Sequence, residues 1–115
     1  MAKILISTSN NGLPGSSVMA EGRAVVILAA IANTAAQWLT PSSVVITAVE
    51  SGKHMKGSKH YIGNAVDVRT KNFPDERSKR DFLAAVMKRL GPGYQGIYED
   101  PEGQNQHLHI EYDPK

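Results

Sequence analysis

Four histidines and one aspartate are the residues of this chain best suited to bind a transition metal. The histidines all lie in the second half of the chain, at positions 54, 60, 107 and 109. Asp67 follows His60 by seven residues and lies between two valines, where a buried carboxylate would be costly without a cation or a metal. His107 and His109 are two residues apart, so in a strand both side chains leave the same face. If the two strands are neighbours, His60, Asp67 and His109 can meet around one metal ion.

The absence of cysteine restricts any such site to imidazole and carboxylate ligands, a set that suits zinc without proving it. Three protein ligands leave a fourth tetrahedral position open for water, which is typical of catalytic rather than structural zinc sites. Each residue also has an ordinary explanation, because a surface histidine often binds nothing and an aspartate after a loop is often a turn or cap residue. The combination of these residues is what favours a metal.

The charge of the chain is modest and unevenly distributed. A net charge of +2, a pI near 9.0 and the lack of interleaved aromatic and basic residues give no argument for nucleic-acid binding. Lys53, Lys56 and Lys59 lie within seven residues, beside His54 and His60. This segment is either a solvated loop or a cationic rim that attracts an anionic substrate.

The elements that must position these residues follow from hydrophobic patterning and turn signals. We expect strands over residues 3–7, 44–49, 65–69, 95–98 and 107–112, and helices over 20–39 and 74–90. Helices packed on an antiparallel sheet give an α+β fold, with residues 1–115 forming a single domain. Phe82, Val86 and Leu90 repeat every four residues and should face the core.

The apolar run over residues 24–32 belongs to the first helix. It is too short and too interrupted to span a bilayer, and it starts too far from the N-terminus to be a signal peptide. Because the helix is apolar on most of its faces, we expect it to be buried at the centre of the molecule. We also expect synthesis in the cytoplasm without a signal peptide, no membrane span and a monomer.

The run SKHYIGNAVD at residues 58–67 matches the S-x-H-x-x-G-x-A-x-D signature of zinc D-Ala-D-Ala carboxypeptidases and their phage endolysin relatives. The segment His107-Leu108-His109 resembles the H-x-H of the same superfamily, which also includes lysostaphin-type peptidases and the hedgehog amino-terminal domain. The resemblance spans about residues 44–112. It implies a hedgehog/DD-peptidase-like fold with one Zn²⁺ held by His60, Asp67 and His109.

The hedgehog domain resembles this chain at two further places. It has a histidine six residues before its first ligand, where this chain has His54, and it has a Tyr-Glu pair that resembles Tyr98-Glu99. From lysostaphin-like relatives, the first histidine of H-x-H is expected near the reacting carbonyl. The resemblance therefore implies that His107 and His54 donate hydrogen bonds to the oxyanion of the transition state.

One position departs from the carboxypeptidase pattern. That branch places a catalytic glutamate three residues before its last zinc histidine, and here the position holds Gln106, which cannot act as a base. Glu99 is the best substitute as general base, with Glu102 as the alternative because the loop before His109 is longer here.

The function implied by the resemblance is zinc-dependent hydrolysis of peptide bonds in peptidoglycan stem peptides, by either a carboxypeptidase or an endopeptidase. Lys53, Lys59 and Arg69 are candidates to hold substrate carboxylates. The protein would act at the cell wall as a phage endolysin or a virion-borne hydrolase. Two alternatives stay open: a non-catalytic, zinc-binding interaction module like the hedgehog domain, and a phage structural protein with incidental histidines.

Overall fold

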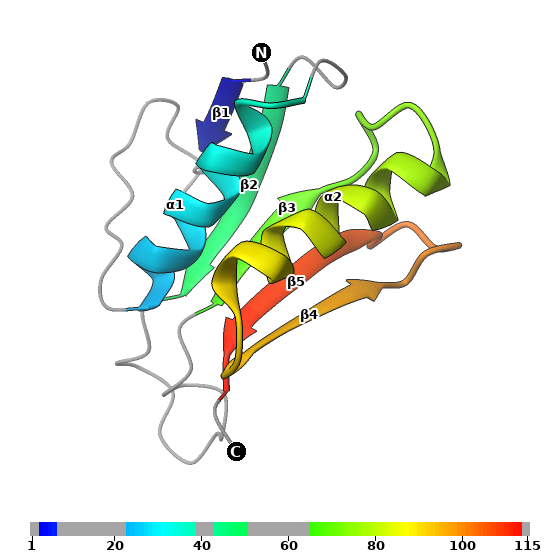
Figure 1. The fold of residues 1–115 in the computed structure, drawn as a ribbon. Helices are drawn as coiled ribbons and strands as arrows, with labels where there is room; N and C mark the ends of the chain where they lie inside the picture. The colour runs from blue at the N-terminus through cyan, green and yellow to red at the C-terminus, as the bar shows by residue number, and fades with distance from the viewer. Residues whose placement is uncertain (1–2, 7–22, 39–42, 51–64, 114–115) are drawn as a thin grey trace.

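The computed structural model describes residues 3–6, 23–38, 43–50 and 65–113, which form five strands and two helices (Figure 1). The strands are β1 (Lys3–Ile6), β2 (Ser43–Glu50), β3 (Ala65–Arg69), β4 (Tyr94–Glu99) and β5 (His107–Tyr112). The helices are α1 (Arg23–Ala35) and α2 (Glu76–Leu90). Each of these elements overlaps a segment expected from the sequence.

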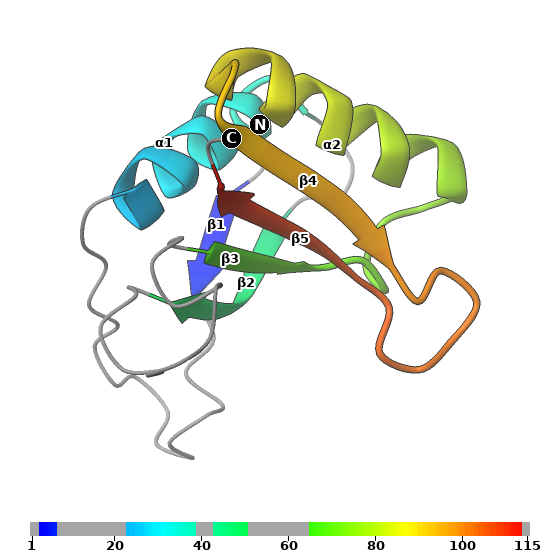
Figure 2. The ribbon, with the colours of Figure 1, turned by 90° about the horizontal axis from the view of Figure 1, so that it is seen from below.

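The strands form one sheet in the order β1-β2-β3-β5-β4. β2, β3, β5 and β4 pair antiparallel, and both helices lie on one face of the sheet (Figure 2). The prediction of an α+β fold with a small antiparallel sheet and two main helices is therefore confirmed. One detail differs, because β1 pairs with β2 in parallel. The chain between these strands includes α1, which serves as the long crossover that a parallel pair requires.

The core lies between the helices and the sheet. Val66 and Val68 of β3 and Leu108 and Ile110 of β5 are fully buried. They pack with helix residues that are also fully buried, namely Ile27, Ile31, Phe82 and Val86. Because side chains alternate along a strand, the residues between these apolar positions point to the opposite face of the sheet. We call this the site face, since the candidate metal ligands of β3 and β5 lie on it.

The first helix is not central, contrary to the expectation from its apolar composition. Ala24, Ile27 and Ile31 are fully buried against the core, but Val25 and Val26 are 49% and 43% exposed. The reason is that a helix on a two-layer fold packs on the sheet with one side only. No helix in the described ranges is long and apolar enough to cross a membrane.

The second helix begins and ends where its sequence signals are. The Asp75 side chain accepts a hydrogen bond from the Ser78 backbone N–H at 2.8 Å and forms a capping box. Gly91 ends the helix with φ at 79°, and its N–H donates to the Met87 carbonyl. Phe82 and Val86 are fully buried and Leu90 packs at the edge of the core, as expected.

Candidate metal centre

The antiparallel register brings the chemistry-bearing residues of β3, β5 and β4 into adjacent rows on the site face. Asp67 of β3 lies opposite His109 of β5, and Arg69 lies opposite His107. On the other side of β5, Glu99 of β4 lies opposite His107. The condition stated from the sequence, that the strands of Asp67 and His109 are neighbours, is therefore met.

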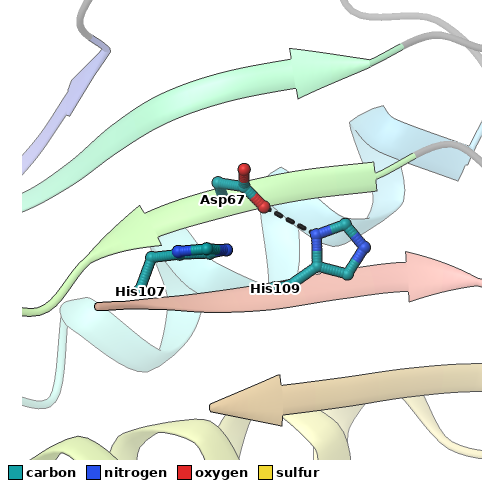
Figure 3. Close-up of side chains that lie close together, drawn as sticks. All are labelled: Asp67, His107 and His109. Carbon is teal, nitrogen blue, oxygen red and sulfur yellow. Dashed lines mark hydrogen bonds and ion pairs between the residues drawn. The ribbon is translucent and has the colours of Figure 1, made fainter. Parts of the chain in front are cut away.

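Asp67, His107 and His109 form the cluster that could hold a metal ion (Figure 3). Each offers one ligand atom, and these atoms all lie within 4.8 Å of one another. The closest pair is His109 Nδ1 and Asp67 Oδ1, at 2.7 Å. Two imidazole nitrogens and a carboxylate oxygen are ligands that zinc accepts. Ligand atoms around tetrahedral zinc lie about 3.4 Å apart, so small side-chain movements would close this cluster on an ion.

His109 has a carboxylate at each ring nitrogen. Nδ1 faces Asp67, and Nε2 lies 2.9 Å from Oε1 of Glu111, whose side chain is 8% exposed. The hydrogen bond to Asp67 raises the pKa of His109 to about 9, despite the opposing effect of burial. The metal-free site therefore holds an imidazolium at neutral pH. A metal ion at Nδ1 would replace this proton and leave Nε2–H donating to Glu111, an arrangement common among metal-binding histidines.

His107 turns its Nε2 atom toward the same site. Its Nδ1 contacts the backbone carbonyl of Asn105, and this carbonyl can only accept, so Nδ1 carries a proton. Nε2 lies 3.3 Å from Oε1 of Glu99. The Asn105 carbonyl thus fixes the tautomer and the orientation of the ring. With Nε2 directed inward, the neutral ring of His107 can bind a metal through the Nε2 lone pair, and donation of a hydrogen bond from Nε2 requires a second ring proton.

The Tyr98-Glu99 pair is divided between the two faces of the sheet. Tyr98 points toward α2, where its hydroxyl donates to the Glu76 carboxylate at 2.9 Å. Glu99 lies on the site face, with Oε1 3.3 Å from His107 Nε2 and 3.9 Å from His109 Nδ1. Glu102 lies exposed in the loop between β4 and β5. Of the two glutamates considered as general base, Glu99 is the one that contacts the cluster.

The Gln106 side chain is held by hydrogen bonds within the protein. Its Oε1 accepts hydrogen bonds from the Thr70 hydroxyl and from Lys79 Nζ, both at 2.7 Å, and its Nε2 donates to the Pro101 carbonyl at 2.6 Å. These bonds tie the β4–β5 loop to Thr70, directly after β3, and to α2. Gln106 therefore holds the loop that carries Asn105, the residue that orients His107.

Several of the residues expected at the site lie outside the described residues. These are the predicted ligand His60, the predicted oxyanion donor His54 and the predicted substrate-binding residues Lys53 and Lys59, and their roles stay predictions. Arg69 is described and lines a pocket that also includes Asp67 and His107. Two residues near the site, Glu111 and Lys71, were not expected from the sequence. The spacing of His107, His109 and Glu111 at every second residue was the signal that could have identified Glu111.

The raised pKa of His109 predicts a pH-dependent stability of the metal-free protein. Because the folded-state pKa of about 9 exceeds the ordinary value of 6.5, the protonated form stabilises the fold fully below about pH 6.5. This contribution, up to about 3 kcal/mol, is lost as the pH rises through about 9. Urea unfolding of the chelator-treated proteins measures this contribution. We expect the free energy of unfolding of the wild type to exceed that of His109→Gln by more at about pH 6 than at about pH 9.5. A stability difference between the two proteins that is equal at both pH values would contradict the prediction.

No protein-family model, curated protein or solved structure matches this chain significantly. A functional assignment therefore depends on the sequence motif and on the geometry of the site face.

Proposed function

We propose that this protein is a zinc-dependent peptidase of bacterial peptidoglycan with a hedgehog/DD-peptidase-like fold. The observation that carries the proposal is the contact between Asp67 and His109, with His107 and Glu99 beside them. Asp67, His107 and His109 lie at the places where the S-x-H-x-x-G-x-A-x-D and H-x-H motifs put ligands and catalytic groups, and Glu99 belongs to the pair that resembles the hedgehog Tyr-Glu. The fold supports the proposal in its coarse features, since a small antiparallel sheet presents all four on the face away from the helices.

Asp67 and His109 would be two of the zinc ligands, and the third is His60 according to the motif. His107, within 4.8 Å of both described ligands, is the alternative third ligand. When bound, zinc supplies Lewis acidity, polarising the scissile carbonyl and lowering the pKa of a bound water to about 7.

The side chains around the ligands would transfer protons and donate hydrogen bonds during the reaction. Glu99 Oε1 accepts the proton of the attacking water and passes it to the leaving amine. His107 Nε2 is held inward by the Asn105 carbonyl and, with both ring nitrogens protonated, would donate a hydrogen bond to the oxygen on which negative charge develops. His54 would assist it, as the resemblance implies. Lys53, Lys59 and Arg69 would hold carboxylates of the stem peptide, in a monomeric enzyme that acts at the wall as a phage endolysin or virion-borne hydrolase.

Incubation of the zinc-loaded protein with purified peptidoglycan tests this function. We expect new amino termini, identified by mass spectrometry, that are absent when a chelator is added and return when zinc is restored. Sacculi with different stem and bridge peptides should be compared, because the position of the new terminus also separates a carboxypeptidase from an endopeptidase. Absence of chelator-sensitive cleavage of every wall type would refute the peptidase.

A non-catalytic zinc-binding module is the second candidate. The observation that favours it is Gln106, which occupies the position of the family glutamate and has both ends of its amide engaged in hydrogen bonds. Such a module would retain stoichiometric zinc while cleaving no wall peptide. The same incubation, combined with metal analysis, separates the two candidates.

Glu111 is expected to strengthen zinc binding by orienting His109. Glu111→Gln should weaken zinc affinity about 10–100-fold, because such a carboxylate partner fixes the imidazole and increases its basicity. Competition with a chromophoric chelator measures the affinity, and Glu102→Gln, an exposed loop change of the same kind, is the matched control. Equal affinities for the two variants would show that Glu111 does not position the ligand.

A further inference from the structure

Lys79 is a buried cation that the proposed mechanism does not use. It lies near the start of α2 and is 8% exposed, and no other lysine or arginine whose side chain the structure describes is buried. Its Nζ donates to Glu76 Oε2 at 2.6 Å and to Gln106 Oε1 at 2.7 Å. Burial alone would lower the pKa of this ammonium group, but hydrogen bonds to Glu76 and Tyr98 raise the pKa above its ordinary value. Lys79 is therefore charged in its buried position.

Stability of the fold does not account for this lysine. A buried ion pair often contributes no more to stability than an apolar side chain of similar volume. The partner carboxylate of Glu76 is 55% exposed, so it would remain hydrated if methionine replaced Lys79. Gln106 Oε1 would still accept a hydrogen bond from Thr70. What only the ammonium group supplies is a directed connection between α2 and the β4–β5 loop.

The hydrogen-bonded network around this ammonium group includes the neighbours of two site-face residues. Gln106 directly precedes His107 in the chain, and Tyr98 directly precedes Glu99. The Tyr98 hydroxyl donates to the Glu76 carboxylate at 2.9 Å. Because neighbouring residues of an extended chain point to opposite faces, the network holds, on the helix side, the same backbone that carries His107 and Glu99 on the site face.

The place of His107 and Glu99 in the sheet makes such support important. They form the last pair of the β4–β5 ladder before the loop, and the ends of ordered elements open more readily than their interiors. The loop also carries the Asn105 carbonyl that orients the His107 ring. A movement of the loop would therefore turn this ring, and the contact of Gln106 with Lys79 joins the loop to α2.

We propose that Lys79 is a positioning residue, which holds β4 and the β4–β5 loop from the helix layer so that His107 and Glu99 keep their places at the metal centre. Lys79 touches none of the candidate ligands itself, and its effect passes through Gln106 and Tyr98. One part of the inference, the orientation of His107, is a property of the metal-free fold. The other part, an effect on hydrolysis, rests on the peptidase proposed above.

The orientation of His107 is tested by NMR without any activity measurement. Long-range proton–nitrogen correlation spectra of the chelator-treated, histidine-labelled full-length protein report which ring nitrogen carries the proton when the ring is neutral. We expect the wild-type ring to be protonated at Nδ1, because the Asn105 carbonyl beside it can only accept. In Lys79→Met, which removes the ammonium group but keeps a long side chain, we expect a mixture of the two neutral tautomers.

Two control variants make this test specific to the ammonium group of Lys79. Lys79→Arg retains a charged donor that can reach Glu76 and Gln106, so it should keep the ring protonated at Nδ1. Lys88→Met makes the same substitution at an exposed position of the same helix and should also leave the tautomer unchanged. If Lys79→Met does not fold, Gln106→Met removes the same contact from the loop side and should give the same mixture of tautomers.

Hydrolysis of wall peptides at saturating zinc tests the second part. Lys79→Met should lower kcat by up to about 10²-fold, because a displacement of about 1 Å at a catalytic group can cost this much. KM should change little, since Lys79 lies on the helix side of the sheet, away from the candidate metal centre. Lys79→Arg should restore most of the rate, and Lys88→Met should keep the wild-type kcat.

The outcomes separate the two proposals. A His107 ring that stays protonated at Nδ1 alone in the folded Lys79→Met or Gln106→Met protein would refute the positioning role, whether or not wall peptides are cleaved. A wild-type kcat in Lys79→Met would refute the effect of Lys79 on hydrolysis. If the tautomer changes as expected but the wild-type protein cleaves no wall peptide, the peptidase is refuted and the positioning of His107 by Lys79 is confirmed.

Discussion

Replacing either Asp67 or His109 by alanine is expected to remove zinc from the protein. The two side chains meet at 2.7 Å across β3 and β5, so each change deletes a ligand atom and also the partner that positions the other. The loss of affinity should exceed the roughly 10–100-fold effect of a supporting carboxylate such as Glu111. Metal analysis after dialysis against a weak chelator should find less than stoichiometric zinc in both variants and no wall cleavage. Circular dichroism would verify that each variant is folded.

The third ligand can be identified in the same experiment. If the motif assigns it correctly, His60→Ala loses zinc while His107→Ala keeps zinc and loses hydrolysis. The opposite result would establish Asp67, His107 and His109 as the ligand set, which is the cluster that the described residues form. Ile97→Ala is the control, because Ile97 lies opposite His109 on β4 and is 46% exposed but has no donor atom. Full zinc retention in Asp67→Ala or His109→Ala would refute the metal site.

The placement of Asp67 and His109 on the face of the sheet away from the core could be predicted from local pattern. Val66 and Val68 alternate with Asp67, and His107 and His109 alternate with Leu108, so period-two patterning alone assigns the polar residues to the face away from the core. The motif then supplies the pairing of the two strands. What alternation cannot supply is the register, because it depends on long-range contacts between residues separated by about forty positions along the chain.

Other features of the site depend on tertiary contacts for which the sequence has no signal. Gln106 Oε1 accepts hydrogen bonds from Thr70, which follows β3, and from Lys79 of α2, and the convergence of these two donors follows only from the packing of α2 beside the β4–β5 loop. The exposure of Val25 and Val26 has a similar origin. Composition shows that α1 is apolar on most sides, but the number of layers in the fold decides how many of those sides are covered.

Replacing Glu99 by glutamine should nearly abolish hydrolysis while zinc is retained. Glu99 is the glutamate whose carboxylate contacts both His107 and His109, at 3.3 and 3.9 Å, and its side chain remains 45% exposed to solvent. A carboxamide preserves the shape but cannot accept the proton of the attacking water. General base catalysis contributes about 10²–10⁴-fold, so kcat should fall by that factor with little change in KM. Wall-hydrolysis rates and metal content of the same preparation measure both effects.

Two controls make the assignment specific to Glu99. Glu102→Gln should leave the hydrolysis rate unchanged, because Glu102 lies exposed in the loop. A large loss of rate in Glu102→Gln would instead identify Glu102 as the general base. Adding Gln106→Glu to Glu99→Gln should not restore activity, although it recreates the family glutamate. The side-chain oxygen at position 106 faces Thr70 and Lys79 Nζ at 2.7 Å, so a carboxylate there would pair with the ammonium group. Rescue of hydrolysis in the double variant would show that position 106 can turn toward the metal centre and that Glu99 is not required as the base.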